Sequence, residues 1–280
     1  MTPQDAIDGW DEERNAEAYA RFAQQYPMYS ATSRELVGLA GLDGSSLAVD
    51  LCGGTGIAAE AMLDDLPGDA RVISVDSSRA MQDVGQRNIQ DPRLTWVTAR
   101  AEAVADHIHE PADAVVCNSA IWKTDIPVTF AAVRSILRPG GHFVFNVGGG
   151  FAGVAHPDEA TGRKGPSLNT LIQGVAARDY GYVLNKVPPK SPNPFSQAAL
   201  EEQLRASGFS VTEARIVAHR STMAEKKAWL SIPLFARPDG DYTYEQRMEM
   251  LDRAYMNVDP DQTTVTSWLV VVAQATSSTR

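Results

Sequence analysis

The chain has few of the features that mark secreted, membrane or zinc-binding proteins. Its 280 residues include only two cysteines, Cys52 and Cys117, too few for a disulfide framework or a zinc site with paired ligands. No segment approaches the ~18 consecutive apolar residues of a membrane span, and the N-terminal stretch lacks the basic and apolar regions of a signal peptide. We therefore expect no metal site, no membrane partner and a cytoplasmic protein.

Positive charge is also scarce. The chain carries 25 lysines and arginines against 35 aspartates and glutamates, a formal net charge of −10. Because a nucleic-acid backbone needs a basic stripe or patch, we expect no nucleic-acid partner. The length is sufficient for one elaborated domain with a substantial core.

Strand-like runs alternate with helical patterns through the first half of the sequence. The strands are predicted at residues 46–51, 71–76, 94–99, 113–118 and 142–147. Such alternation is typical of parallel strands joined by helical crossovers. A nucleotide-binding type of α/β sheet is therefore the predicted core.

The alternation of strand and helix patterns ends after residue 147, where a Gly- and Pro-rich stretch begins. A short helix at 197–206, a strand from 209 to about 220 and the apolar run "VTSWLVVVAQA" complete the sheet. We predict a Rossmann-like, doubly wound α/β fold with seven strands, the last antiparallel. The predicted parts are an N-terminal helical lid (1–45), the ligand-binding core (46–147), a cap insertion (148–196) and the rest of the sheet (197–280), which includes a second cap insertion at about 224–263.

The stretch "VDLCGGTG" places a glycine-rich loop between the first strand and a helix. Gly53, Gly54 and Gly56 let backbone N–H groups and the helix N-terminus approach a ligand. The next strand ends at Asp76, whose carboxylate can accept hydrogen bonds from a ribose diol. Asp76 could instead cap the following helix. A nucleoside ligand is indicated, but the G-x-G-x-x-A spacing also fits an NAD-dependent oxidoreductase.

Four motifs together are more specific than the loop alone. "VDLCGGTG", "SVDSSRAM", "ADAVVCNSAIW" and "LRPGGHFVFNV" resemble, in order and spacing, the class I S-adenosylmethionine-dependent methyltransferases of small-molecule type, over residues from about 15 to 147. The resemblance implies S-adenosyl-L-methionine as cofactor and in-line transfer of its methyl group to O, N or C of a medium-sized molecule in specialised-metabolite biosynthesis. The alternatives are a non-methylating cyclase on the same scaffold and the oxidoreductase above. A homodimer is compatible with the sequence.

The resemblance also implies which residues contact the cofactor. Arg100 stands where the family commonly has an aspartate, so Ala101 and Glu102 are the expected adenine contacts. Cys52 departs from the first glycine of the family's loop; we expect a packing residue at negative φ rather than a nucleophile. The expected cofactor-binding residues are Tyr29, Asp50, Cys52, Gly53, Gly54, Gly56, Asp76, Ser77, Met81, Ala101, Glu102, Asn118 and Ser119.

The sequence indicates less clearly which residues would bind the methyl acceptor and assist the transfer. Displacement at a sulfonium needs no covalent catalytic residue, so a base or a positioning aromatic would suffice. The candidates for catalysis are His156, His219 and Trp122. The candidates for substrate binding are Tyr26, Trp122, Asn146, Trp229 and Tyr255. Each has a structural alternative, because aromatic residues often fill a core and histidines are often solvated or structural.

Overall fold

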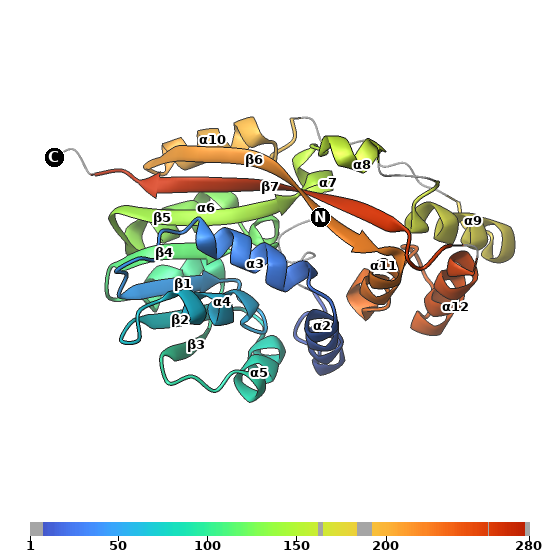
Figure 1. Ribbon diagram of the computed structural model, residues 1–280, viewed down its shortest axis with the longest axis horizontal. Helices are drawn as coiled ribbons and strands as arrows, with labels where there is room; N and C mark the ends of the chain where they lie inside the picture. Colours follow the sequence, from blue (N-terminus) through green and yellow to red (C-terminus); the bar gives the residue numbers. More distant parts are fainter. Residues whose placement is uncertain (1–7, 162–164, 184–191, 257, 278–280) are drawn as a thin grey trace.

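The computed structural model describes residues 8–161, 165–183, 192–256 and 258–277. Its centre is one seven-stranded sheet with the order β3-β2-β1-β4-β5-β7-β6 (Figure 1). The five strands from β3 to β5 run parallel, while β7 is antiparallel to both β5 and β6. The predicted Rossmann-like fold is confirmed. The strands are β1 Leu47–Leu51, β2 Arg71–Asp76, β3 Leu94–Thr98, β4 Ala112–Cys117, β5 Leu137–Gly148, β6 Phe209–Thr222 and β7 Thr263–Ala275.

Helices connect the parallel strands and form the insertions. Several begin at a side chain that caps the first turn, as at Ser78, Asp125 and Ser196, because that oxygen satisfies an otherwise unpaired backbone N–H. The helices are α2 Glu13–Gln25, α3 Met28–Gly38, α4 Ile57–Asp65, α5 Arg79–Asn88, α6 Ile126–Ile136, α7 Gly149–Ala152, α8 Pro157–Thr161, α9 Leu168–Tyr180, α10 Gln197–Ala206, α11 Met223–Leu230 and α12 Tyr244–Tyr255, with 3-10 turns η1 Ala101–Asp106, η2 Ile121–Lys123 and η3 Pro233–Phe235.

The central strands of the sheet are buried on both faces. On one face, Leu36 of α3 and Met62 of α4 pack against β1 and β2; on the other, Phe130 of α6 and Leu200 of α10 pack against β4 and β5. Strands covered on both sides read as near-continuous apolar runs. This explains why β1 is buried at all five positions and why its mostly apolar sequence predicted a strand.

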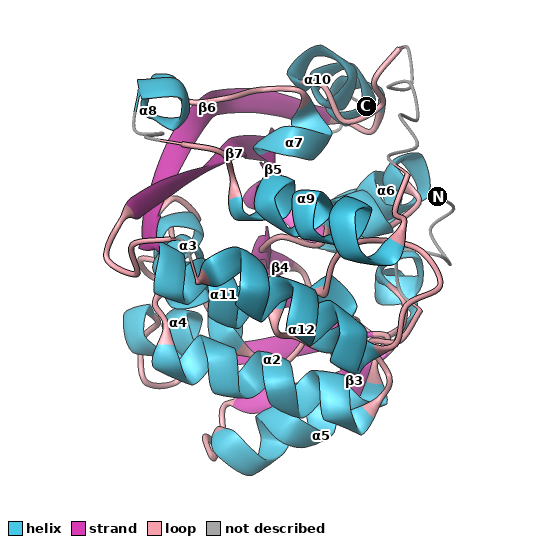
Figure 2. Ribbon diagram, turned by 90° about the vertical axis from the view of Figure 1, so that its right-hand side faces the viewer, coloured by secondary structure: helices cyan, strands magenta, loops and turns pink. Residues whose placement is uncertain are grey.

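Helices from both ends of the chain gather at the edge of the sheet where the parallel strands end. Figure 2 shows α2, α11, α12 and α9 in front of this edge. The backbone N–H of Met28, at the start of α3, donates to the carboxylate of Glu225 in α11. One turn further along α11, Trp229 Nε1 donates at 3.0 Å to the hydroxyl of Tyr29, the residue that follows Met28 in α3. The N-terminal helices and the excursion after β6 therefore form one joined wall.

The strand β5 is longer than predicted. It begins at Leu137, whereas the sequence suggested a start at residue 142, because Leu137 pairs with Ala112 before a register shift in the ladder.

None of the helices described spans enough apolar residues to cross a membrane.

Candidate active site

A large cavity lies where β1, β2, β4 and β5 end, beneath the wall of helices. It encloses about 1210 Å³ of empty space, its open mouth included. It is lined by Trp10, Tyr19, Tyr29, Ser33, Asp50, Cys52, Gly53, Gly54, Ile57, Ala58, Asp76, Ser77, Met81, Arg100, Ala101, Glu102, Asn118, Ser119, Ala120, Trp122, Lys123, Thr124, Gly148, Phe151, Trp229, Phe235 and Trp268.

The end of β2 presents a carboxylate that is held by two backbone groups. Asp76 Oδ2 accepts a hydrogen bond from Gly54 N at 2.8 Å, and Oδ1 accepts one from Ser78 N at 2.7 Å. Burial raises the pKa of Asp76, and these two N–H groups act against that rise. Each oxygen retains a lone pair for a ligand. The carboxylate is thus oriented toward the cavity with the capacity to accept from a vicinal diol.

Asp50 forms part of the cavity floor and also caps α4. Its Oδ2 accepts from Ala59 N at 3.1 Å and from Ser74 Oγ at 3.4 Å, and the residue is 1% exposed. Burial raises the pKa of Asp50 to about 7. The side chain therefore caps the first turn of α4 and also lines the cavity.

Cys52 adopts a backbone conformation that differs from our expectation. Its φ is +56°, in the left-handed region, where we expected a negative value. The turn between β1 and the glycines requires this conformation, which a non-glycine residue adopts at some cost. The Cys117 thiol hydrogen-bonds to the Cys52 thiol, and this contact together with burial raises the pKa of Cys52. A protonated thiol is a poor nucleophile.

We expect Cys52→Ala to leave cofactor affinity within about twofold and the free energy of unfolding within about 1 kcal/mol, because it removes only a packing contact and a weak hydrogen bond between two thiols. Cys52→Gly should be at least as stable as the alanine variant, since glycine adopts φ +56° without strain. Calorimetric titration with S-adenosylhomocysteine and urea unfolding measure both effects. A loss of binding in Cys52→Ala would assign the thiol a direct role.

The loop after β4 is fixed by a network of amides. Asn146 Oδ1 accepts from Ser119 N at 2.6 Å, and Asn146 Nδ2 donates to Asn118 Oδ1 at 2.9 Å. Asn118 Nδ2 in turn donates to Thr32 and Ser33 of α3, at 3.1 and 2.8 Å. Ser119 has φ +60°, so these contacts hold a strained turn at the cavity. Asn146 is 1% exposed and does not line the cavity; the structure gives it a positioning contact in place of the expected substrate contact.

Two stacked pairs of aromatic rings line the cavity. Trp122 stacks on Phe151 with ring centroids 4.2 Å apart, and Trp229 stacks on Phe235 at 4.3 Å. Trp268, in β7, lines the same region, and its Nε1 is buried without a hydrogen-bond partner among the residues described. These surfaces favour a ligand with an apolar or planar skeleton.

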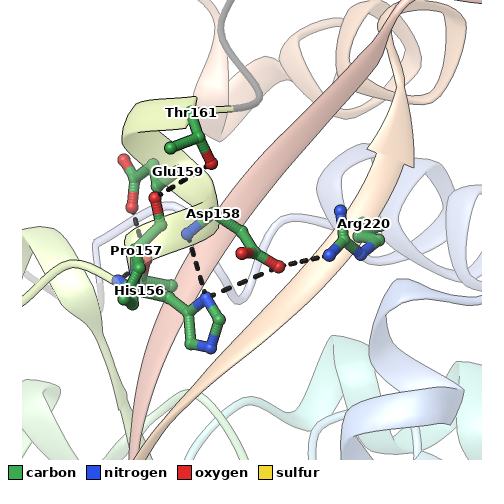
Figure 3. Close-up of polar contacts among 7 residues, drawn as sticks. His156, Pro157, Asp158, Glu159, Thr161 and Arg220 are labelled. Atoms are coloured by element: carbon green, nitrogen blue, oxygen red, sulfur yellow. Dashed lines mark hydrogen bonds and ion pairs between the residues drawn. The ribbon is translucent and has the colours of Figure 1, made fainter.

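Both candidate histidines lie outside the cavity lining. His156 Nδ1 accepts from Asp158 N at 3.2 Å and lies 3.7 Å from the carboxylate of Asp158, which also pairs with Arg220 (Figure 3). His219 Nε2, on β6, lies 3.6 Å from Glu225 Oε1. His156 contacts a residue of α8 and His219 faces Glu225 of α11, and neither residue lines the cavity.

Three further expected contacts also fall outside the cavity. Tyr26 stacks on Phe22 at 5.2 Å, and Tyr255 packs in the cluster formed by α9 and α12. Gly56, with φ +83°, begins α4 beneath Trp96, where a Cβ would lie 2.5 Å from the ring. Its requirement for glycine comes from packing.

The expected residues that do line the cavity are Tyr29, Asp50, Cys52, Gly53, Gly54, Asp76, Ser77, Met81, Ala101, Glu102, Asn118, Ser119, Trp122 and Trp229. The sequence did not single out Trp10, Tyr19, Lys123, Phe151 and Trp268. Lys123 directly follows Trp122, and Phe151 follows the glycines at the end of β5. Their position next to predicted strand ends could have indicated both residues. Trp10, Phe235 and Trp268 reach the cavity only through tertiary packing. Among the residues described, no group of three or more potential ligands is arranged to hold a metal.

Comparison with known proteins identifies the domain. A methyltransferase domain family matches residues 48–141, the segment that contains β1, β2, β4 and the loops that line the cavity. No curated protein sequence matches the chain.

Solved structures share the fold at low sequence identity. A candidate methyltransferase from Bacillus halodurans C-125 has a TM-score of 0.56 at 15% identity, over 88% of this chain and 100% of that one. A chain from the Haloferax volcanii complex between the Trm112 methyltransferase activator and a candidate methyltransferase has a TM-score of 0.54 at 17% identity, over 99% of this chain and 98% of that one. The [4+2]-cyclase SpnF has a TM-score of 0.53 at 13% identity, over 88% of this chain and 80% of that one. Residues 48–141 thus match a methyltransferase domain, and the chain has the class I, S-adenosylmethionine-dependent methyltransferase fold.

Proposed function

We propose that the protein transfers a methyl group from S-adenosylmethionine to a medium-sized small molecule bound in the aromatic part of the cavity. The observation that carries this proposal is one continuous cavity with two chemically different parts. One part presents backbone groups and carboxylates from the ends of β1 and β2. The other is walled by stacked aromatic rings and reaches β5 and β7.

The first part fits the cofactor. Asp76 would accept from the ribose hydroxyls, and the glycine loop would bring its backbone close to the amino-acid end. Gly54, with φ +56°, supports a close approach, because a Cβ there would lie 3.1 Å from Met81 Cε. When bound, S-adenosylmethionine supplies an electrophilic methyl group on a sulfonium. The role of this chain is to hold donor and acceptor in line and to exclude water.

The second part fits an acceptor with an apolar skeleton. Trp229 is fixed by its hydrogen bond to Tyr29, and Trp122 by one from its Nε1 to Ser119 O at 3.2 Å. Rings held in place contribute contact area at little cost in conformational entropy. In-line transfer between such walls needs no general base for an acceptor that is already nucleophilic at neutral pH.

Calorimetry and an isotope experiment test the proposal. We expect S-adenosylhomocysteine to bind and NAD not to bind, which separates the methyltransferase from the oxidoreductase. Incubation of the protein with methyl-labelled cofactor and a panel of small acceptors should then give labelled product. Product that lacks the label but forms only in the presence of cofactor would instead indicate a non-methylating cyclase.

We expect Asp76→Ala to weaken S-adenosylhomocysteine binding by about 10- to 100-fold, because a buried charged acceptor for the ribose is lost. Asp113→Ala is the matched control. Asp113 also accepts from two backbone groups, Ser46 N at 2.7 Å and Leu47 N at 3.0 Å, but it lies at the opposite edge of the sheet. It should lose stability and keep its affinity in calorimetric titration. Equal affinities for the two variants would remove Asp76 from the site.

A further inference from the structure

Lys123 is the charged residue of the cavity that the proposed function does not use. It ends η2, directly after Trp122, and lines the cavity. Its Nζ lies 3.9 Å from the centroid of the Trp10 ring and 5.4 Å from that of Trp122. The ammonium group is therefore positioned between a ring from the N-terminal segment and a ring from the loop after β4.

The other charges that line the cavity are already engaged. Asp50 and Asp76 accept from backbone N–H groups. Arg100 Nε lies 3.3 Å from Glu102 Oε2, and Glu102 Oε1 also accepts from Asp125 N at 2.8 Å. In the part of the chain that the structure describes, Lys123 forms no ion pair within 4.0 Å. Its charge is stabilised by the faces of two indole rings, which attract a cation but leave its N–H donors available.

A cation without an anionic partner in a mostly apolar cavity carries a cost in desolvation free energy, which an anionic ligand would offset. Burial lowers the pKa of Lys123, while the carboxylate of Asp76 acts to raise it. An anionic group that entered the cavity would remove this cost and form a charge-assisted hydrogen bond.

Two ligand groups could supply that anion: a carboxylate on the acceptor or the carboxylate of the cofactor. In S-adenosylmethionine the ribose hydroxyls and the amino-acid carboxylate lie on opposite sides of the sulfonium. Lys123 lies in the electrostatic field of Asp76, the residue assigned to the ribose. Lys123 also lies in the field of Cys52, in the loop assigned to the amino-acid end, so the comparison of two nucleosides described below separates the two sources of the anion.

We propose that Lys123 is the specificity-determining residue for the acceptor: it binds an anionic group, such as a carboxylate, carried on an aromatic or unsaturated skeleton that packs against Trp122 and Phe151. This proposal rests on the proposed function, because it assigns the acceptor to the aromatic part of the cavity. It narrows the acceptor from any apolar molecule to a planar or unsaturated organic anion.

Two fluorescent probes of the same skeleton test the charge preference. 8-Anilinonaphthalene-1-sulfonate carries an anion, and N-phenyl-1-naphthylamine lacks it. Both are titrated into the protein with saturating S-adenosylhomocysteine present, so that the cofactor part of the cavity is filled. We expect Lys123→Met to weaken binding of the sulfonate by about 10- to 100-fold and to leave binding of the neutral amine unchanged. Lys123→Arg should retain most of the preference.

Lys227→Met is the matched control. Lys227 also lies over an aromatic ring, 4.7 Å from the centroid of Tyr255, and pairs with Asp252 at 2.8 Å, but it does not line the cavity. It should bind both probes as the wild type does. Equal loss of sulfonate binding in the two variants, or no loss in Lys123→Met, would overturn the proposal.

A second comparison separates the two sources of the anion. 5′-Methylthioadenosine lacks the amino-acid end of S-adenosylhomocysteine. If Lys123→Met weakens S-adenosylhomocysteine but not 5′-methylthioadenosine, then Lys123 binds the cofactor carboxylate, and the acceptor assignment is wrong. A wild-type protein that binds neither nucleoside would instead contradict the proposed function, a result that does not depend on Lys123.

Discussion

Gly53→Ala is expected to destabilise the protein by about 3 kcal/mol and to weaken S-adenosylhomocysteine binding at least tenfold, because the new methyl group has no space. A Cβ at Gly53 would lie 2.3 Å from Ser74 Oγ and 2.4 Å from Asp50 Oδ2. Neither atom can move freely, since Asp50 is held by Ala59 N and Ser74 lies within β2. The loop must then leave the position in which Gly54 N donates to Asp76.

Urea unfolding and calorimetric titration measure the two effects. Gly68→Ala is the control, because Gly68 is exposed between α4 and β2 and a Cβ there would meet nothing within 4 Å. It should leave stability within about 1 kcal/mol and affinity unchanged. A Gly53→Ala protein as stable as Gly68→Ala would show that the strand β2 and the loop can separate without cost.

Asp50→Asn is expected to gain stability relative to the wild type as the pH rises. The difference in free energy of unfolding between the variant and the wild type should be about 3 kcal/mol larger at pH 8 than at pH 4. Burial raises the pKa of Asp50 from its ordinary value of 3.8 to about 7 in the folded protein. Between these values the unfolded chain has lost the proton and the folded protein has kept it. Folding therefore loses stability as the pH rises from about 4 to about 7. Asparagine keeps an acceptor for Ala59 N and carries no charge to bury.

Unfolding by urea at several pH values, without cofactor, gives the difference directly. Asp91→Asn is the control of opposite sign, because the Arg93 side chain lowers the pKa of Asp91. Its carboxylate contributes stability above its ordinary pKa, so the asparagine variant should not gain relative to the wild type at high pH. A pH-independent difference for Asp50→Asn would mean that Asp50 is ionised without cost in the folded protein.

The sequence predicted the core of the fold because its signals are local. A strand buried on both faces is a continuous apolar run, and β2 was predicted with the bounds it has, 71–76. The turn from β1 to α4 requires glycines, which are recognisable in the sequence. Asp76 at the end of β2 was likewise predictable, since adjacent parallel strands end at the same edge of a sheet.

The acceptor side was less predictable because its residues come from distant parts of the chain. Trp10, Phe235 and Trp268 meet around the cavity, although each resembles an ordinary core aromatic in its own segment. His156 and His219 were chosen for their chemistry, but their rings are engaged with Asp158 and Glu225. Which side of a strand or loop such a residue faces depends on register and on packed neighbours.

The stretch "AVDLCGGTG" by itself determined that a strand turns sharply into a helix through a loop that can approach a ligand closely, because only small residues permit that turn. Only the tertiary structure decided the rest. It places Cys52 at φ +56° and leaves the Lys123 ammonium between two indole rings at the cavity. The glycines of the turn stand together in one stretch of sequence, whereas contacts such as those of Trp10 with Lys123 and of Tyr29 with Trp229 join residues more than a hundred positions apart.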